Sequence, residues 1–190
     1  FLPFLVEGLR NHEEHQLCTI SVGIVGDVCR SLAERATKYS ETLVLALFED
    51  LQSPVLHRNV KPHILSCFGD IAMAIGPAFE SYLPTAMAVL QQASMVQNAP
   101  DTADYEMVEY VNDLREGIAE AYVGIVSGFR MAGKADVLLP YMDYTLAFVG
   151  LVASDSIDRS ETLLRSTIGL VGDLATAYPT GPVMVKLQQP

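Results

Sequence analysis

Five carboxylates at helical spacing form the most distinctive chemical feature of this chain. They are separated by 3, 4, 3 and 4 residues: Glu106, Glu109, Asp113, Glu116 and Glu120. In an α-helix these steps bring all five onto one face, where neighbouring like charges repel by roughly 0.2–0.5 kcal/mol per pair. Such a stripe suits a basic protein segment. The alternative is that it forms the ordinary solvated face of an acidic protein.

A second set of acids ends three similar phrases. Val22–Asp27, Ser66–Asp70 and Ile168–Asp173 each finish in Gly-Asp, whereas a weaker fourth copy finishes at Gly128. We expect Asp27, Asp70 and Asp173 to occupy equivalent positions on successive helices, at the rim of the buried face. Each aspartate then either bonds to a neighbouring repeat or binds a partner directly.

The chain carries no recognisable catalytic or metal-binding pattern. His12 and His15 are three residues apart, but no cysteine or third histidine completes a zinc site. Calcium-loop and phosphate-loop motifs are also missing, since the Gly-x-x-Gly pairs fall inside expected helices. We therefore predict a binding protein with no enzymatic activity, no cofactor and no metal.

Net charge limits the class of partner. The 190 residues include 23 Asp plus Glu and 12 Lys plus Arg, for a net charge of −11. Direct binding to nucleic acid is disfavoured, because that needs a basic surface. A basic protein partner is expected instead, although acidity also serves solubility alone. The longest apolar runs fall short of the ~20 residues that span a bilayer, so membrane insertion is not expected.

The three cysteines, Cys18, Cys29 and Cys67, fall on apolar helical faces. Their number is odd, and their spacing matches no metal site. We interpret them as small buried apolar residues in a reducing compartment.

The repeated phrases set the fold class. Positions 27, 70, 128 and 173 are 43, 58 and 45 residues apart, and helical periodicity dominates between them. A period of about 40–47 residues built from helices is typical of HEAT or armadillo repeats. We predict an all-α HEAT-repeat α-solenoid, a right-handed superhelix of antiparallel helix pairs. Its expected repeats are 1–37, 38–77, 78–133 and 134–178, with 179–190 beginning a further one.

Each repeat is expected to hold a first helix, A, and a second helix, B, that carries the repeated phrase. The A helices are expected over 2–10, 40–51, 79–96 and 135–153, and the B helices over 13–36, 56–75, 104–130 and 160–178. A polar link over 97–103 explains the wider third interval. Glycine recurs inside the B helices although it costs up to ~1 kcal/mol relative to Ala. We expect these glycines to allow close approach of neighbouring B helices: Gly23, Gly26, Gly69, Gly124, Gly128, Gly169 and Gly172.

Three stretches resemble the importin-β (karyopherin-β) family of nuclear import receptors. They are 59–72 (NVKPHILSCFGDIA), 120–126 (EAYVGIV) and 171–174 (VGDL). The similarity runs through nearly all of the chain, which resembles the C-terminal part of such a receptor. The stretches 131–136 and 180–190 look closer to fungal forms than to animal ones.

The resemblance implies a solenoid whose B helices line a concave face. It implies recognition of the basic importin-β-binding segment of importin α through acidic residues, which favours a binding role for Glu106 to Glu120. It also implies cargo proteins, Ran-GTP and phenylalanine-glycine nucleoporins as partners of the full receptor, in the cytoplasm, the nucleus and the nuclear pore and envelope. The alternative is a HEAT-repeat scaffold subunit of another complex.

In the family, nucleoporin pockets lie between neighbouring A helices. The candidate lining residues in this chain are Leu43, Leu47, Phe48, Phe79, Tyr82 and Leu83.

Overall fold

The computed structural model describes residues 1–97, 105–154 and 160–188, and every regular element in these ranges is helical. The α-helices are α1 (Leu2–Leu9), α2 (His15–Leu32), α3 (Thr37–Gln52), α4 (Lys61–Ile75), α5 (Leu83–Ser94), α6 (Tyr105–Met131), α7 (Met142–Ser154), α8 (Glu161–Ala177) and α9 (Pro182–Leu187). Short 3-10 helices connect them: η1 (Ala33–Ala36), η2 (Arg58–Val60), η3 (Gly76–Ser81) and η4 (Ala135–Tyr141). The polar link expected over 97–103 falls outside the described residues except for Gln97.

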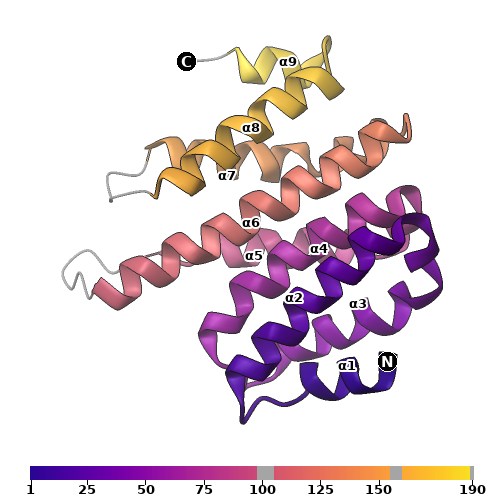
Figure 1. The fold of residues 1–190 in the computed structure, drawn as a ribbon. Helices are drawn as coiled ribbons and strands as arrows, with labels where there is room; N and C mark the ends of the chain where they lie inside the picture. Colours follow the sequence, from indigo (N-terminus) through magenta and orange to yellow (C-terminus); the bar gives the residue numbers. More distant parts are fainter. Residues whose placement is uncertain (98–104, 155–159, 189–190) are drawn as a thin grey trace.

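The helices stack in two layers (Figure 1). The B layer is continuous, because α2 packs on α4, α4 on α6 and α6 on α8. The A layer contains α1, α3, α5 and α7, and each of its helices precedes its B-layer partner in the chain. This arrangement is the all-α HEAT-repeat solenoid that the repeat spacing predicts. The residue boundaries given above for each repeat remain our proposal.

Local sequence explains where several helices begin and end. Pro62 lies in the first turn of α4, where its missing N–H is tolerated. Ser160 precedes α8, and its hydroxyl oxygen accepts a 3.0 Å hydrogen bond from the Leu163 backbone N–H. The chain leaves α4 at Gly76 with φ of +52°, which glycine adopts readily. Ala33 takes a similar φ of +49° after α2, so the helix expected to continue to residue 36 changes into η1 there.

A single core runs along the stack and joins the two layers. α4 lies between α2 and α6 and is buried along most of its length. Two aromatic pairs connect A-layer helices to B-layer helices, one within a repeat and one between successive repeats. The Phe48 and Phe68 ring centroids are 4.9 Å apart between α3 and α4, and those of Tyr122 and Phe148 are 5.6 Å apart between α6 and α7. These contacts bury large apolar surfaces, the main stabilising contribution in a solenoid.

All three cysteines are buried free thiols, as the sequence predicts. Burial raises the pKa of Cys18 and of Cys29 to about 11, and it also raises the pKa of Cys67. Negative charge adds to the effect, from Asp50 at Cys18 and from Asp70 at Cys29 and Cys67. The thiolate, which is the reactive form, is therefore scarce at neutral pH.

Glycine permits unusually close contact between α4 and α6. A Cβ placed on Gly69 would lie 2.7 Å from the Glu120 carbonyl oxygen. Cβ atoms on Gly117, Gly124 and Gly128 of α6 would likewise run into the backbone of α4. The expectation of close approach is confirmed for this pair of helices, where only hydrogen fits between the backbones.

The same expectation is wrong for three other glycines. No atom outside their own helices lies within 4 Å of a Cβ placed on Gly23, Gly169 or Gly172. Gly26 serves a different purpose, because its missing side chain leaves space for the Asp70 carboxylate and not for a backbone. The repeated glycine phrase therefore has different structural roles in different repeats.

Two segments, Arg58–Ser81 and Ala135–Ser154, meet the length and hydropathy criteria of a membrane-spanning helix. Core helices of globular proteins meet the same criteria. The first segment contains α4, which is enclosed by neighbouring helices, and the second buries Phe148 and Val152 in the shared core. We therefore assign both segments to the packed solenoid.

The α4–α6 contact predicts the effect of adding one methyl group. Gly124→Ala gains up to ~1 kcal/mol of helix propensity but forces the two backbones apart, and overpacking costs about 1–3 kcal/mol. We expect a net loss in the free energy of unfolding. Gly150→Ala in α7 is the control, since nothing lies within 4 Å of its added Cβ, and it should raise stability. Urea unfolding measures both effects, and a Gly124→Ala protein as stable as Gly150→Ala would contradict this packing.

Candidate functional site

The B layer carries an acidic groove of about 400 Å³ that crosses three successive helices. Five carboxylates line it, from Asp27 on α2, Asp70 on α4, and Asp113, Glu116 and Glu120 on α6. The positively charged or titratable basic side chains in its lining are Arg30 and His63. Five of the eight acids predicted from sequence are therefore brought together at one site.

The structure places the other three predicted acids elsewhere. Glu106 and Glu109 lie on the first turns of α6, are exposed, and do not line the groove. Glu106 forms a 3.3 Å ion pair with Arg58. Asp173 on α8 is 3.5 Å from Arg130 of α6 and is also outside the groove. The stripe along α6 is thus a groove wall only in its middle part.

The repeated aspartates serve as joints between repeats. Arg30 of α2 pairs with Asp70 of α4, and Arg130 of α6 pairs with Asp173 of α8. Asp27 differs, because its partner Arg30 is on its own helix at 2.6 Å. The predicted bond to a neighbouring repeat is therefore confirmed for Asp70 and Asp173. Sequence analysis missed both arginines, since nothing in their spacing marks them as partners.

Hydroxyl groups satisfy two of the α6 carboxylates. Ser66 of α4 donates a 2.6 Å hydrogen bond to Glu120, and Ser160, just before α8, donates to Glu116. These bonds orient the carboxylates but supply no compensating positive charge. The positive charge of a binding partner can therefore still be attracted to them.

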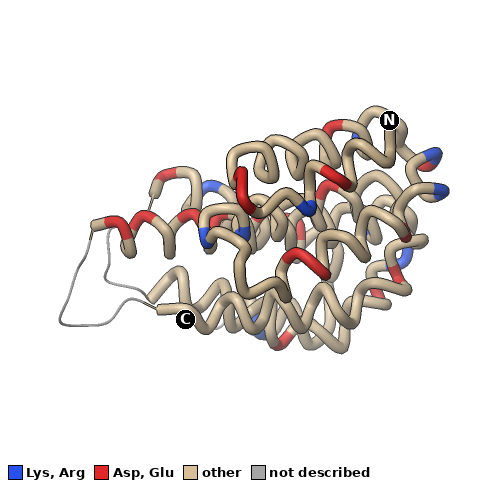
Figure 2. The backbone as a smooth tube through the Cα atoms, turned by 90° about the horizontal axis from the view of Figure 1, so that it is seen from below, with Lys and Arg blue, Asp and Glu red and all other residues tan. Residues whose placement is uncertain are grey.

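The pKa of Asp113 reflects the negative charges that surround it in the groove. Partial burial and then the negative charges of Glu116 and Glu109 raise its pKa, against a smaller opposing effect of His63. Arg115, which is also on α6, is buried and only 3% exposed. Figure 2 shows how acidic positions outnumber Lys and Arg positions along the backbone. The groove is consequently a region of concentrated negative charge.

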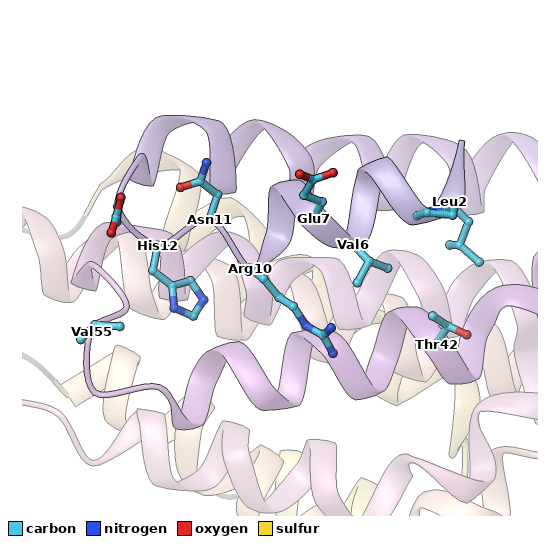
Figure 3. Close-up of a pocket in the computed structure, with 10 residues that line it drawn as sticks. Leu2, Val6, Glu7, Arg10, Asn11, His12, Thr42 and Val55 are labelled. Atoms are coloured by element: carbon cyan, nitrogen blue, oxygen red, sulfur yellow. The ribbon is translucent and has the colours of Figure 1, made fainter.

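Two further hollows lie on the A-helix side. One of about 860 Å³ separates α1 from α3 and is lined by Leu2, Val6, Arg10, Thr42 and Val55 among others (Figure 3). The second, of about 310 Å³, lies between α3 and α5 beside the first turns of α4 and α6. Its apolar lining is Phe48, Leu51, Leu65, Val89, Ala93, Val96 and Leu114.

Most of the residues expected to line a nucleoporin pocket line neither of these hollows. Four of the expected residues are buried in the core: Leu43 and Leu47 on α3, Phe79 on η3 and Leu83 at the start of α5. Tyr82 is partly buried, and its hydroxyl lies 3.4 Å from that of Ser40. Of the six expected residues, only Phe48 lines the hollow between α3 and α5.

Two histidines near the start of α2 have structural partners. His12 bonds through Nε2 to Asp50 at 2.9 Å and through Nδ1 to the Ser53 hydroxyl at 3.1 Å. His15 instead stacks on His57, with ring centroids 4.4 Å apart. No group of three or more His, Cys, Asp or Glu side chains suited to a metal occurs within 1–97, 105–154 and 160–188. The pairing of His12 with Asp50 has no sequence signal, because the two residues are 38 positions apart.

Comparison with known sequences identifies relatives over the whole chain. The family described as "Importin subunit beta-1-like, TPR repeats" matches residues 1–190. Importin subunit beta-1 of Schizosaccharomyces pombe is 48% identical over 95% of this chain and 21% of that protein. Importin subunit beta-1 of Arabidopsis thaliana is 44% identical over 92% of this chain and 20% of that protein. The chain thus spans about a fifth of the length of these relatives. TPR and HEAT repeats are both helix pairs, and the intervals of 43 and 45 residues in this chain fit the longer HEAT unit.

Solved structures agree with the sequence comparison. A crystal structure of importin beta superposes with a TM-score of 0.93 at 44% identity, over 100% of this chain and 22% of that one. The Kap95:Nup1 complex gives 0.84 at 32% identity, over 93% and 20%. A structure of Kap95p with RanGDP gives 0.88 at 31% identity, over 98% and 22%.

The raised pKa of Asp113 predicts a stability change on neutralisation. A carboxylate whose pKa is higher in the folded state destabilises the fold once pH rises through that pKa. Asp113→Asn should therefore raise the free energy of unfolding at pH 7 by roughly 0.2–1 kcal/mol, the size of one or two relieved like-charge pairs. The gain should disappear at pH 3, where Asp113 is largely protonated.

Asp143→Asn is the matched control for this experiment. The Asp143 carboxylate accepts a hydrogen bond from Lys186, so its neutralisation removes a favourable interaction. Thermal unfolding at both pH values tests the comparison. A stability at pH 7 no higher for Asp113→Asn than for Asp143→Asn would refute the repulsion inferred at Asp113.

Proposed function

Because the chain belongs to the importin subunit beta-1-like family, we propose that it is a segment of a nuclear transport receptor. We further propose that its acidic groove binds the basic importin-β-binding segment of importin α. One observation carries this proposal: among the described residues, five carboxylates from three successive B helices line a groove together with one arginine and one histidine. The expected C-terminal position of this segment within the receptor is not supported by the comparisons, and the proposal does not use it.

The geometry suits a basic helix laid across the B layer. A basic helix offers charges along its length, and the groove presents carboxylates on α2, α4 and α6 in succession. Exposed charge pairs contribute roughly 0.2–1 kcal/mol each, so affinity is expected to come from several pairs together. The principal binding residues in this proposal are Asp113, Glu116 and Glu120. Asp27 and Asp70 lie at the edge of the groove. Glu106 and Glu109 extend the negative field beyond the groove.

We extend the proposal to the other partners of a transport receptor. The Kap95:Nup1 structure supports nucleoporin binding by the full receptor, and the structure of Kap95p with RanGDP supports binding of Ran. The proposal adds binding of Ran-GTP and transport of cargo between cytoplasm and nucleus through the nuclear pore. The two structures also favour a transport receptor over a scaffold subunit of another complex. A binding function without catalysis fits the receptor names of the relatives.

The groove predicts how affinity responds to charge removal. The triple variant Asp113→Asn, Glu116→Gln, Glu120→Gln should weaken binding of the importin-α segment by about 0.6–3 kcal/mol if the three pairs add. The loss should shrink at high salt, because the Debye length falls from ~10 Å at 0.1 M to ~3 Å at 1 M. Isothermal titration of the full-length protein at both salt concentrations measures the effect.

A control with the same charge change separates the groove from net charge. Glu34→Gln, Glu41→Gln, Glu80→Gln also removes three negative charges, from exposed residues that do not line the groove. This variant should bind almost as tightly as the wild type. Equal losses in the two triple variants would show that only total charge matters and would end the groove proposal.

We also propose that the hollow between α3 and α5 accepts phenylalanine side chains of nucleoporins. Its apolar lining and its position between neighbouring A helices support this assignment. Val89→Glu should weaken binding of a Phe-Gly peptide by about fivefold or more, equivalent to ~1 kcal/mol, because a charge enters an apolar site. Ile168→Glu, at an exposed side chain of α8, is the control and should have little effect. Chemical-shift changes confined to α2 and α8 would contradict the assignment.

A further inference from the structure

Arg30 occupies the acidic groove from within the protein itself. Its side chain is about half exposed, and its Nη2 atom donates a 2.6 Å hydrogen bond to Asp27. Its Nη1 atom pairs with Asp70 of the next B helix. Gly26 makes this arrangement possible, since a Cβ at that position would collide with the Asp70 carboxylate. Two carboxylates and a glycine thus form a fitted site for one guanidinium group.

We propose that Arg30 is an internal competitor for this site, and that an arginine of a basic partner segment takes its place when the segment binds. This inference rests on the proposed function of the groove. Arg30 would then limit affinity, because Asp27 and Asp70 are available only after its side chain moves into solvent. An exposed arginine can make that exchange without unpacking the core.

Within residues 1–97, 105–154 and 160–188, no arginine pairs with the other carboxylates of the groove. Glu120 and Glu116 accept bonds from serine hydroxyls, and Asp113 faces His63 and two acids that raise its pKa. We therefore expect a partner to meet two kinds of subsite. The α6 side attracts any basic residue through charge, whereas the Arg30 side selects for shape.

The shape selection follows from the two nitrogen atoms that Arg30 uses. A guanidinium presents a planar fork that reaches two carboxylates at once, whereas a lysine ammonium is a compact point charge. Removal of Arg30 should therefore favour arginine-rich partners more than lysine-rich ones. A residue that only stabilised the α2–α4 joint would not change this preference.

Arg30→Gln tests the proposal in the full-length protein, with Arg165→Gln as the control. The Arg165 side chain is exposed on α8, pairs with Glu161 of its own helix, and carries the same charge as Arg30. The probe is a fluorescent arginine-rich helical peptide, compared with versions that carry lysine or uncharged citrulline. We expect Arg30→Gln to bind the arginine peptide about three- to tenfold more tightly than Arg165→Gln at low salt, as two released carboxylates would give. Its gain for the lysine peptide should be smaller, and the citrulline peptide should show none.

Arg30→Lys keeps the test decisive if Arg30→Gln does not fold. Lysine retains the positive charge but bridges the two aspartates less effectively than arginine does. The affinity of Arg30→Lys for the arginine peptide should therefore lie between those of the wild type and of a protein with a vacant site. An affinity of Arg30→Gln no higher than that of Arg165→Gln, or of Arg30→Lys no higher than wild type, would overturn the proposal. In that case, the proposed function of the groove would still stand if the wild-type protein binds the arginine peptide and the α6 triple variant does not. Wild type that binds no basic peptide would overturn both.

Discussion

The close packing of α4 against α6 is the constraint on which the rest of the structure depends. Glycine at positions 69, 117, 124 and 128 lets the two backbones approach to a distance that any side chain would prevent. This contact places the middle of α6 beside Ser66 and Asp70 of α4. Its carboxylates therefore join those of α2 and α4 in one groove. A wider spacing between these helices would separate the acids and dilute their field.

Successive helices of the B layer, α2 to α8, are held together in two different ways. The groove lies where the second way is used. Arg30–Asp70 and Arg130–Asp173 use charge to connect successive B helices, which neutralises the acids involved. The α4–α6 joint uses glycine and backbone contact, so it consumes no charge. Acids next to that joint are satisfied by serine hydroxyls and remain available to a positively charged partner. Asp70 and Asp173 are thus paired with arginine across a joint, whereas Glu116 and Glu120 are hydrogen-bonded to serine.

The sequence predicts the fold well because helical periodicity and breakers are local signals. Serine marks a helix start at Ser160, and glycine marks an end at Gly76. The helix expected from residue 56 begins only at Lys61, with Pro62 in its first turn and the 3-10 helix η2 before it. The sequence does not predict the backbone conformation at Ala33, because this residue adopts a positive φ with no local cue. The site is predicted only in part. Spacing places the α6 acids on one face, but the choice of Asp113 over Glu106, and the capture of Asp70 by Arg30, depend on contacts between distant residues.

The pKa of Asp113 tests most directly whether a basic segment binds in this groove. Carboxyl NMR can follow its titration in the free protein and in the complex with the importin-α segment. In the free protein, burial and neighbouring acids raise this pKa above its ordinary value. Our account predicts a clear fall on binding, because a nearby positive charge favours the ionised form. An unchanged pKa in a saturated complex would contradict it, since the segment would then bind elsewhere on the solenoid.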